Sequence, residues 1–125
     1  MDVTPQVPVG RQVIQGYGPG GFRIANQRHD GSVLVFPEKT LAWPIVDFAA
    51  LAVEGLAEIA AAQPKVELLL LGTGTVMKLA SPVLRAHFRA LGIMLETMDT
   101  GAACRTYNVL MAEERHVAAA LIALS

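Results

Sequence analysis

The chain has 125 residues, of which 53% are hydrophobic and 17% are charged, and its formal net charge is −1. This length and composition predict one folded domain with a sizeable core and exclude a largely disordered chain. The near-neutral charge, without a basic run, argues against a nucleic-acid-binding protein, because such proteins need clustered lysine and arginine.

Cysteine usage and the first residues predict a cytoplasmic protein. Cys104 is the only cysteine, so no internal disulfide can form, which suits a reducing compartment. The first residues show no secretory signal, and no apolar run approaches the ~20 residues of a transmembrane helix. We expect a flexible tail over residues 1–12 and a single α/β domain over residues 13–125.

The first part of this domain predicts β structure. Residues 13–15 begin a strand, and the glycine-rich residues 16–21 predict a turn after it. Residues 22–25 alternate apolar and polar side chains, as a half-buried strand does. The Asp30-Gly31 pair is typical of a hairpin turn, so we expect residues 32–36 to return as the partner strand.

The glycine-rich residues 16–21 and Trp43 are the two features of this first part that could contact a ligand. For both of them the sequence favours a structural role. The glycine spacing in residues 16–21 differs from the dinucleotide-binding motif, and no helix pattern follows it. Trp43 lies in a short apolar piece before Pro44, and we interpret it as an anchor in the core or at a sheet edge. The alternative is a ring that stacks on a ligand.

A helix is predicted after Asp47, whose carboxylate can cap its amino end. The helix ends near Gln63, before Pro64. Its apolar positions recur at helical spacing and form one stripe: Phe48, Leu51, Ala52, Leu56 and Ile59.

Four consecutive leucines at residues 68–71 follow Val66 and Glu67. A run without a polar face predicts a strand buried on both faces, at the centre of a parallel sheet covered by helices. The strand stops at the turn of residues 72–75, Gly-Thr-Gly-Thr, where glycine permits a sharp bend. In an open α/β sheet, this carboxyl end is where ligands bind.

Helix and strand alternate over the remaining residues. Ser81-Pro82 predicts a capped helix, residues 93–98 predict a strand, and Asp99 caps a further helix that runs to about residue 113. For residues 117–124 two alternatives stay open, a helix favoured by alanine or a tightly covered strand. This order predicts parallel strands with right-handed crossovers.

The parallel order brings two turns together at the carboxyl edge of the sheet, residues 72–75 and 99–101. The free N–H groups at the start of the last helix favour an anion there. We therefore predict a small-anion or carboxylate site whose ligand-binding residues are Gly72, Thr73, Gly74, Asp99, Thr100, Arg105 and Asn108. In the structural alternative, Asp99 and Thr100 only cap the helix, and Arg105 pairs with Glu113 or Glu114.

No complete catalytic constellation is visible, so we predict no catalytic residue and no cofactor. The helix start could favour a thiolate at Cys104, but cysteine is more often a small buried apolar residue. The three histidines lack the spacing of metal ligands, so no metal is predicted at His29, His87 or His116.

Several motifs follow one another in an order that is typical of one family. They are residues 14–22, Trp43, residues 70–74, residues 98–100, residues 103–110, Glu113 and Arg115. The most specific is Arg105-Thr106-Tyr107-Asn108. With these motifs the chain resembles the domain of unknown function 498 family, which includes the mitochondrial complex I assembly factor 3.

The resemblance implies a single three-layer domain: a mixed β-sheet with α-β-α-β crossovers, plus a smaller N-terminal β-hairpin layer. It also implies that residues 117–122 form the final strand. In eukaryotic members the role is assembly of the respiratory NADH dehydrogenase, with another assembly factor as partner. We therefore expect a non-enzymatic assembly or interaction module with a protein partner. The alternative is a ligand binder or minor enzyme that uses the two turns, and a homo-oligomer stays open.

Overall fold

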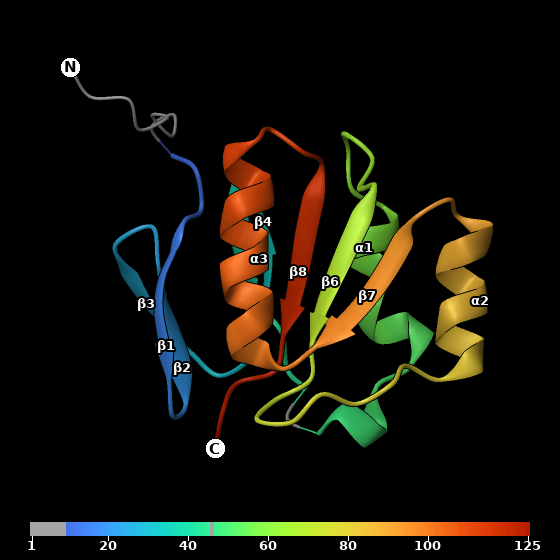
Figure 1. The fold of residues 1–125 in the computed structure, drawn as a ribbon, viewed down its shortest axis with the longest axis horizontal. Helices are drawn as coiled ribbons and strands as arrows, with labels where there is room; N and C mark the ends of the chain where they lie inside the picture. Colours follow the sequence, from blue (N-terminus) through green and yellow to red (C-terminus); the bar gives the residue numbers. More distant parts are fainter. Residues whose placement is uncertain (1–9, 46) are drawn as a thin grey trace.

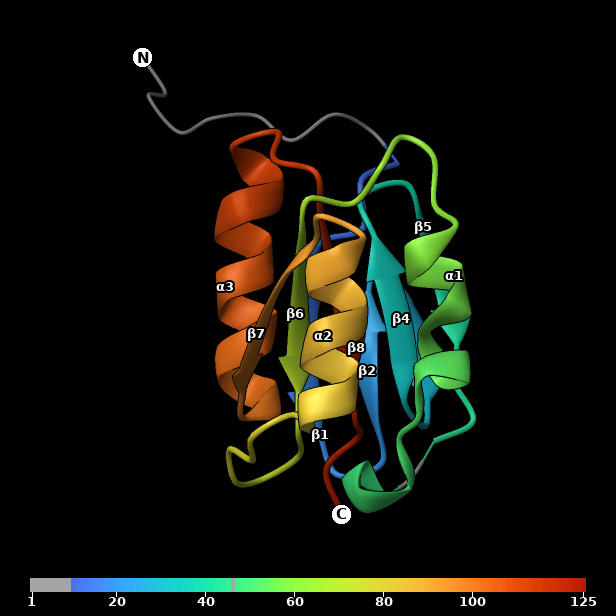
Figure 2. The same ribbon diagram turned by 90° about the vertical axis from the view of Figure 1, so that its right-hand side faces the viewer.

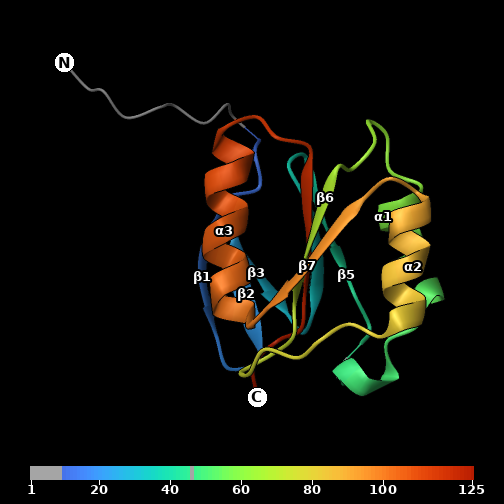
Figure 3. The ribbon, with the colours of Figure 1, turned by 45° about the vertical axis from the view of Figure 1, so that its right-hand side comes forward.

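The computed structural model describes residues 10–45 and 47–125. Over these ranges the chain forms three layers (Figure 1). A five-stranded sheet lies in the middle; α1 and α2 cover one face, and α3 lies on the other face beside a three-stranded sheet (Figure 3). This confirms the predicted α/β fold with a mixed sheet and a smaller amino-terminal β layer.

The smaller sheet has the order β1-β2-β3 and the larger sheet the order β5-β4-β8-β6-β7. The smaller sheet contains β1 (Ile14–Gly18), β2 (Gly21–Ile24) and β3 (Gln27–Asp30). The larger sheet contains β4 (Val33–Phe36), β5 (Lys39–Ala42), β6 (Leu68–Gly72), β7 (Met94–Met98) and β8 (Val117–Leu121). The α-helices are α1 (Ala57–Ala60), α2 (Pro82–Ala90) and α3 (Thr100–Ala112).

β8 occupies the centre of the larger sheet, and the leucine strand β6 lies between β8 and the edge strand β7. β6 runs parallel to both neighbours, whereas β4 is antiparallel to β8. The expectation that the leucine strand is the sheet's centre is therefore wrong. β8 takes the centre because its fully buried alanines, residues 118–120, let the layers on both faces approach closely.

Burial of β6 on both faces is confirmed. Leu69 and Leu71 pack with the apolar side chains of α1 and α2, whereas Leu70 faces the cluster that contains α3. All five residues of β8 are buried too, and its strand conformation agrees with the family resemblance. Packing on two faces therefore outweighs the helix propensity of alanine.

The amino-terminal hairpin turns at Ala25-Asn26, where both residues have positive φ angles, 50° and 66°. This two-residue turn joins β2 to β3. Gly31, with a φ of 82°, instead leads the chain from the small sheet into β4 of the large one. The predicted hairpin at Asp30-Gly31 is therefore wrong. The sequence does not predict β3, because Gln27–Asp30 is polar and largely exposed and lacks the alternation of apolar and polar residues that is typical of a strand. His29 therefore lies in a strand and not in a turn.

The single helix predicted after Asp47 is also wrong. The chain forms two 3-10 helices, Phe48–Ala50 and Val53–Leu56, and then the one-turn helix α1. The backbone is extended at Leu51 and Ala52, which interrupts the helix. In the second 3-10 helix the indole N–H of Trp43 donates to the carbonyl of Gly55 at 2.8 Å, so a distant side chain takes an acceptor that a continuous α-helix would use. Trp43 is buried, as predicted for a core anchor.

The two later helices begin where the sequence predicts. The Ser81 hydroxyl accepts from the Leu84 N–H at 3.2 Å, and the Asp99 carboxylate accepts from the Ala102 N–H at 2.9 Å. Most of the tail predicted over residues 1–12 lies outside the described residues, which begin at residue 10. Gln12 is fixed, because its N–H donates to the Pro37 carbonyl at 3.0 Å.

Candidate functional site

The two turns that sequence brings together do lie side by side at the carboxyl edge of the sheet. The Thr73 N–H donates to the Met98 carbonyl at 2.9 Å, which holds the end of β6 against the end of β7. The Gly74 N–H donates to the Thr100 hydroxyl at 2.9 Å, and the Thr100 N–H donates to the Gly74 carbonyl at 2.8 Å. The polar groups of the two turns are therefore directed at each other.

Other groups of the predicted site also bond within the chain. The Thr100 hydroxyl donates to the Ile122 carbonyl at 2.7 Å, and the Thr73 hydroxyl donates to the Val76 carbonyl at 2.7 Å. A Cβ atom on Gly72 would lie 3.0 Å from the Cα atom of Thr100, so a larger residue would require the two segments to move apart by a few tenths of an ångström. The hollow beside Gly74 has a volume of only about 220 Å³.

The three remaining predicted residues lie on or before α3, and each has a partner in the chain. Asp99 caps the helix. The side-chain amide of Asn108 accepts from the Ile14 N–H at 2.9 Å and donates to the Ile14 carbonyl at 2.8 Å, which fastens β1 to α3. Arg105 is exposed, and its guanidinium donates to the hydroxyl of Tyr17 rather than pairing with Glu113 or Glu114.

Cys104 is buried, in agreement with the apolar interpretation of this residue. Burial raises the pKa of its thiol from 9.0 to about 12, and the nearby Arg105 guanidinium offsets only a smaller part of that rise. A thiol with such a pKa is protonated at neutral pH, so the helix start does not produce a nucleophilic thiolate here.

Large apolar side chains are exposed on the segment that connects β6 to α2. Val76, Met77 and Leu79 are 65%, 49% and 69% exposed, and Val83 in the first turn of α2 is 72% exposed. We call these four residues the apolar loop. The segment runs below the sheet from the end of β6 to the start of α2 (Figure 2).

The turn residues hold the apolar loop in shape. The Thr73 hydroxyl donates to the Val76 carbonyl and accepts from the Lys78 N–H at 3.1 Å. The Met77 sulfur lies 3.8 Å from the Thr97 hydroxyl of β7, which donates to it. Hydrogen bonds from Thr73 and Thr97 therefore hold the loop in place while its apolar side chains are exposed to solvent. Sequence reasoning missed this feature, although the string Val-Met-Lys-Leu after a glycine turn was a readable signal.

A second feature that sequence reasoning missed lies at the opposite end of the larger sheet. A hollow of about 650 Å³, here named the end hollow, opens between the β4–β5 turn and the segments that lead into β6 and β8. Its lining includes Arg11, Glu38 and Arg115, three residues that are far apart in the sequence. No linear pattern could have revealed it, because only folding brings these segments together.

Within residues 10–45 and 47–125, no group of histidine, cysteine, aspartate or glutamate side chains is placed to hold a metal ion. None of the helices in the same ranges combines the length and apolar character that a bilayer crossing requires.

Residues 14–122 match the family model described as protein of unknown function, DUF498/DUF598. An uncharacterized protein of Rhodobacter capsulatus is 39% identical over 122 residues, which cover 96% of this chain and 93% of that protein. The NADH dehydrogenase (ubiquinone) 1 alpha subcomplex assembly factor 3 of Danio rerio is 36% identical over 110 residues. The match covers 88% of this chain and 63% of the assembly factor, so the chain spans less than two thirds of that relative.

Solved structures share the fold. The crystal structure of an outer membrane protein from Bartonella henselae has a TM-score of 0.86 and 37% identity, covering 94% of this chain and 98% of that one. The solution structure of a Mth938-like domain from Bordetella pertussis has a TM-score of 0.80 and 28% identity, covering 98% and 92%. The described residues therefore have the fold of a Mth938-like domain.

Proposed function

The chain belongs to the DUF498/DUF598 family of proteins of unknown function, and on that premise we propose that it is a non-enzymatic module that binds a protein partner during assembly of the respiratory NADH dehydrogenase. The class of partner follows from the relatives that are named as assembly factors of this complex. We place this activity in the cytoplasm, since a single buried thiol fits a reducing compartment.

The apolar loop is the observation that carries the proposal. Isolated exposed apolar side chains are common on protein surfaces, but here Val76, Met77 and Leu79 are nearly consecutive and largely exposed. A loop whose backbone is already braced loses little conformational entropy when it binds, which favours a protein interface. Methionine adds an adaptable contact, because its flexible side chain fits uneven surfaces.

The test is recovery of the partner with a tagged full-length chain expressed in its own organism. Membranes are solubilised in a mild detergent, and co-purified proteins are quantified by mass spectrometry for the unchanged chain, Leu79→Asp and Val109→Asp. Val109 is a matched control, since it is a 59% exposed apolar residue on α3, a different element. Thermal unfolding of each variant checks that the fold is intact.

We expect the unchanged chain and Val109→Asp to recover NADH dehydrogenase subunits or an assembly factor. Leu79→Asp should recover about tenfold less, the effect of losing an interface residue worth about 1.4 kcal/mol. Equal recovery by Leu79→Asp, or no such protein with the unchanged chain, would contradict the proposal.

A small-anion or carboxylate site at the turns of residues 72–74 and 99–101 is the less favoured function. The Gly74 N–H, the Thr100 N–H and the Thr100 hydroxyl already have partners within the chain. A ligand would have to break those bonds, and the adjacent hollow of about 220 Å³ lies below the ~300–1,000 Å³ of small-molecule sites.

A further inference from the structure

The end hollow has no role in the proposed function, and its size is that of a ligand site. Its volume of about 650 Å³ lies within the ~300–1,000 Å³ range of small-molecule pockets. It lies at the end of the sheet away from the apolar loop, beside Pro37 of the β4–β5 turn and His116 before β8. A ligand there would leave the apolar loop free.

The floor of the end hollow is apolar and rigid. Phe36, Val66 and Val117 line it, and they are at most 4% exposed. Phe36 is the last residue of β4 and Val117 is the first residue of β8, so the sheet fixes both. These buried side chains leave little surface for a ligand, so the apolar surface open to one comes from Pro37, Ala62 and Pro64, which also line the hollow.

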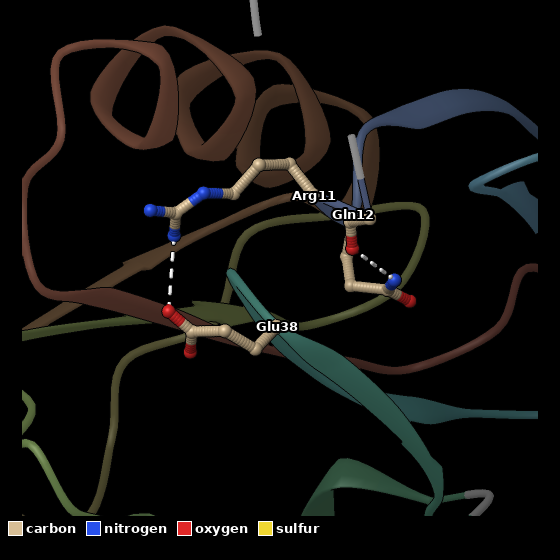
Figure 4. A network of polar contacts seen from close by, with 4 residues as sticks. Arg11, Gln12 and Glu38 are labelled. Atoms are coloured by element: carbon tan, nitrogen blue, oxygen red, sulfur yellow. Dashed lines mark hydrogen bonds and ion pairs between the residues drawn. The ribbon is translucent and has the colours of Figure 1, made fainter. Parts of the chain in front are cut away.

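The rim of the end hollow carries four basic side chains, two of which have acidic partners. Arg11 Nη1 lies 3.0 Å from Glu38 Oε1 (Figure 4). His116 Nδ1 lies 3.7 Å from Glu67 Oε1. The first pair offsets the Arg11 charge beside the β4–β5 turn, and the second is an ion pair only when His116 is protonated.

Lys39 and Arg115 are the other two basic side chains of the rim. Within the described residues, neither has a carboxylate at ion-pair distance. The Lys39 ammonium lies 5.2 Å from the centroid of the Phe36 ring, directly above the apolar floor. Glu114 is the remaining acidic residue of the rim.

We propose that the end hollow binds a small organic carboxylate, with its apolar body against Pro37, Ala62 and Pro64 and its carboxylate between Lys39 and Arg115. The planar guanidinium of Arg115 can hold a carboxylate with two hydrogen bonds, and the Lys39 ammonium supplies a point charge beside it. The apolar lining contacts the hydrocarbon part of the ligand, and the basic side chains of the rim bind its carboxylate.

The test is an NMR titration of the full chain with decanoate, kept below the concentration at which it forms micelles. Decanol and decyltrimethylammonium, which have the same apolar body without the negative charge, are the ligand controls. The variants are Lys39→Gln with Arg115→Gln and, as a matched control, Arg85→Gln with Arg89→Gln. The control pair borders a different hollow, between α2 and β7.

We expect saturable shifts of the backbone amides of residues 62–66 and 114–117 with decanoate, and much weaker ones with decanol. The Lys39→Gln, Arg115→Gln variant should bind decanoate about tenfold more weakly, as expected for two exposed ion pairs, whereas the control variant should be unchanged. Decanoate that shifts no amide in these segments, decanol that binds equally well, or an unchanged affinity in the rim variant would each overturn the proposal. None of these outcomes bears on the recovery of a protein partner through Leu79.

Discussion

Thr100 and Gly74 join the two turns at the carboxyl edge of the sheet through a reciprocal pair of hydrogen bonds. The Gly74 N–H donates to the Thr100 hydroxyl at 2.9 Å, and the Thr100 N–H donates to the Gly74 carbonyl at 2.8 Å. The same hydroxyl donates to the Ile122 carbonyl at 2.7 Å. One buried side chain therefore links the ends of β6 and β8 to the start of α3.

This relationship predicts that Thr100→Val destabilises the fold. Valine has nearly the shape of threonine, so packing is kept, but the Gly74 N–H and the Ile122 carbonyl lose their partner inside the protein. Each unsatisfied buried group costs about 1–3 kcal/mol, so we expect a loss of about 2–4 kcal/mol in the free energy of unfolding. Urea denaturation followed by circular dichroism measures it.

Thr100→Ser is the control for that substitution, because it keeps the hydroxyl and removes only a methyl group. We expect it to cost less than about half as much as Thr100→Val. If the two variants were equally destabilised, packing of the methyl group and not the hydrogen bonds would hold the turns together.

The Asn108–Ile14 contact predicts a second destabilising change. Asn108→Asp keeps an acceptor for the Ile14 N–H but loses the donor to the Ile14 carbonyl and places a negative charge against that carbonyl. We expect a loss of about 1–3 kcal/mol at neutral pH, with β1 released from α3. Faster amide hydrogen exchange at Ile14 and a lower urea midpoint would show it.

Protonation supplies the control for Asn108→Asp. At a pH below the pKa of the new carboxyl group, the neutral side chain can donate again, so part of the loss should be recovered. A stability difference from the unchanged chain that does not vary with pH would mean that charge and donor loss are not the cause.

Local signals in the sequence sufficed for much of the fold. Ser81 and Asp99 mark the starts of α2 and α3 because a cap is a contact between neighbours in sequence. The four leucines mark a buried strand because burial on two faces removes every polar position. The family resemblance was needed for β8, where alanine's helix propensity opposes the observed strand.

The failures arise where distant residues decide the local structure. Trp43 takes the carbonyl of Gly55, and the apolar stripe after Asp47 becomes short 3-10 turns instead of a helix. At the predicted site, sequence placed Thr73 and Thr100 together, but it could not show that their hydroxyls face the backbone of the neighbouring segments. Hydrogen-bond partners of this kind are a property of the tertiary structure.

Burial of Cys104 predicts a loss of stability at alkaline pH. Desolvation raises the pKa of its thiol from 9.0 to about 12 in the folded chain, so the folded chain keeps a proton that the unfolded chain releases. The contribution of this thiol to the free energy of unfolding is fully present below about pH 9 and is lost as the pH rises toward 12. Its slope is at most about 1.4 kcal/mol per pH unit.

Urea denaturation at several pH values between about 8 and 11 measures this slope. Cys104→Ala removes the titrating thiol and should flatten the curve over that interval, although its stability at neutral pH falls because a small cavity forms. The same alkaline slope in Cys104→Ala and in the unchanged chain would show that other groups cause it. Tyr107 is the next candidate, since burial raises the pKa of its hydroxyl as well.

Tyr107→Phe is predicted to stabilise the protein. The Tyr107 hydroxyl is buried and has no hydrogen-bond partner among the described residues, so removing it relieves an unsatisfied polar group while the ring stays in the core. We expect a gain of about 1 kcal/mol in the free energy of unfolding, measured by urea denaturation. Tyr17→Phe is the matched control, because its hydroxyl accepts from Arg105 at the surface, and its loss should be neutral or slightly destabilising. A Tyr107→Phe variant less stable than the unchanged chain would mean that the hydroxyl finds a partner in solution, such as an internal water molecule.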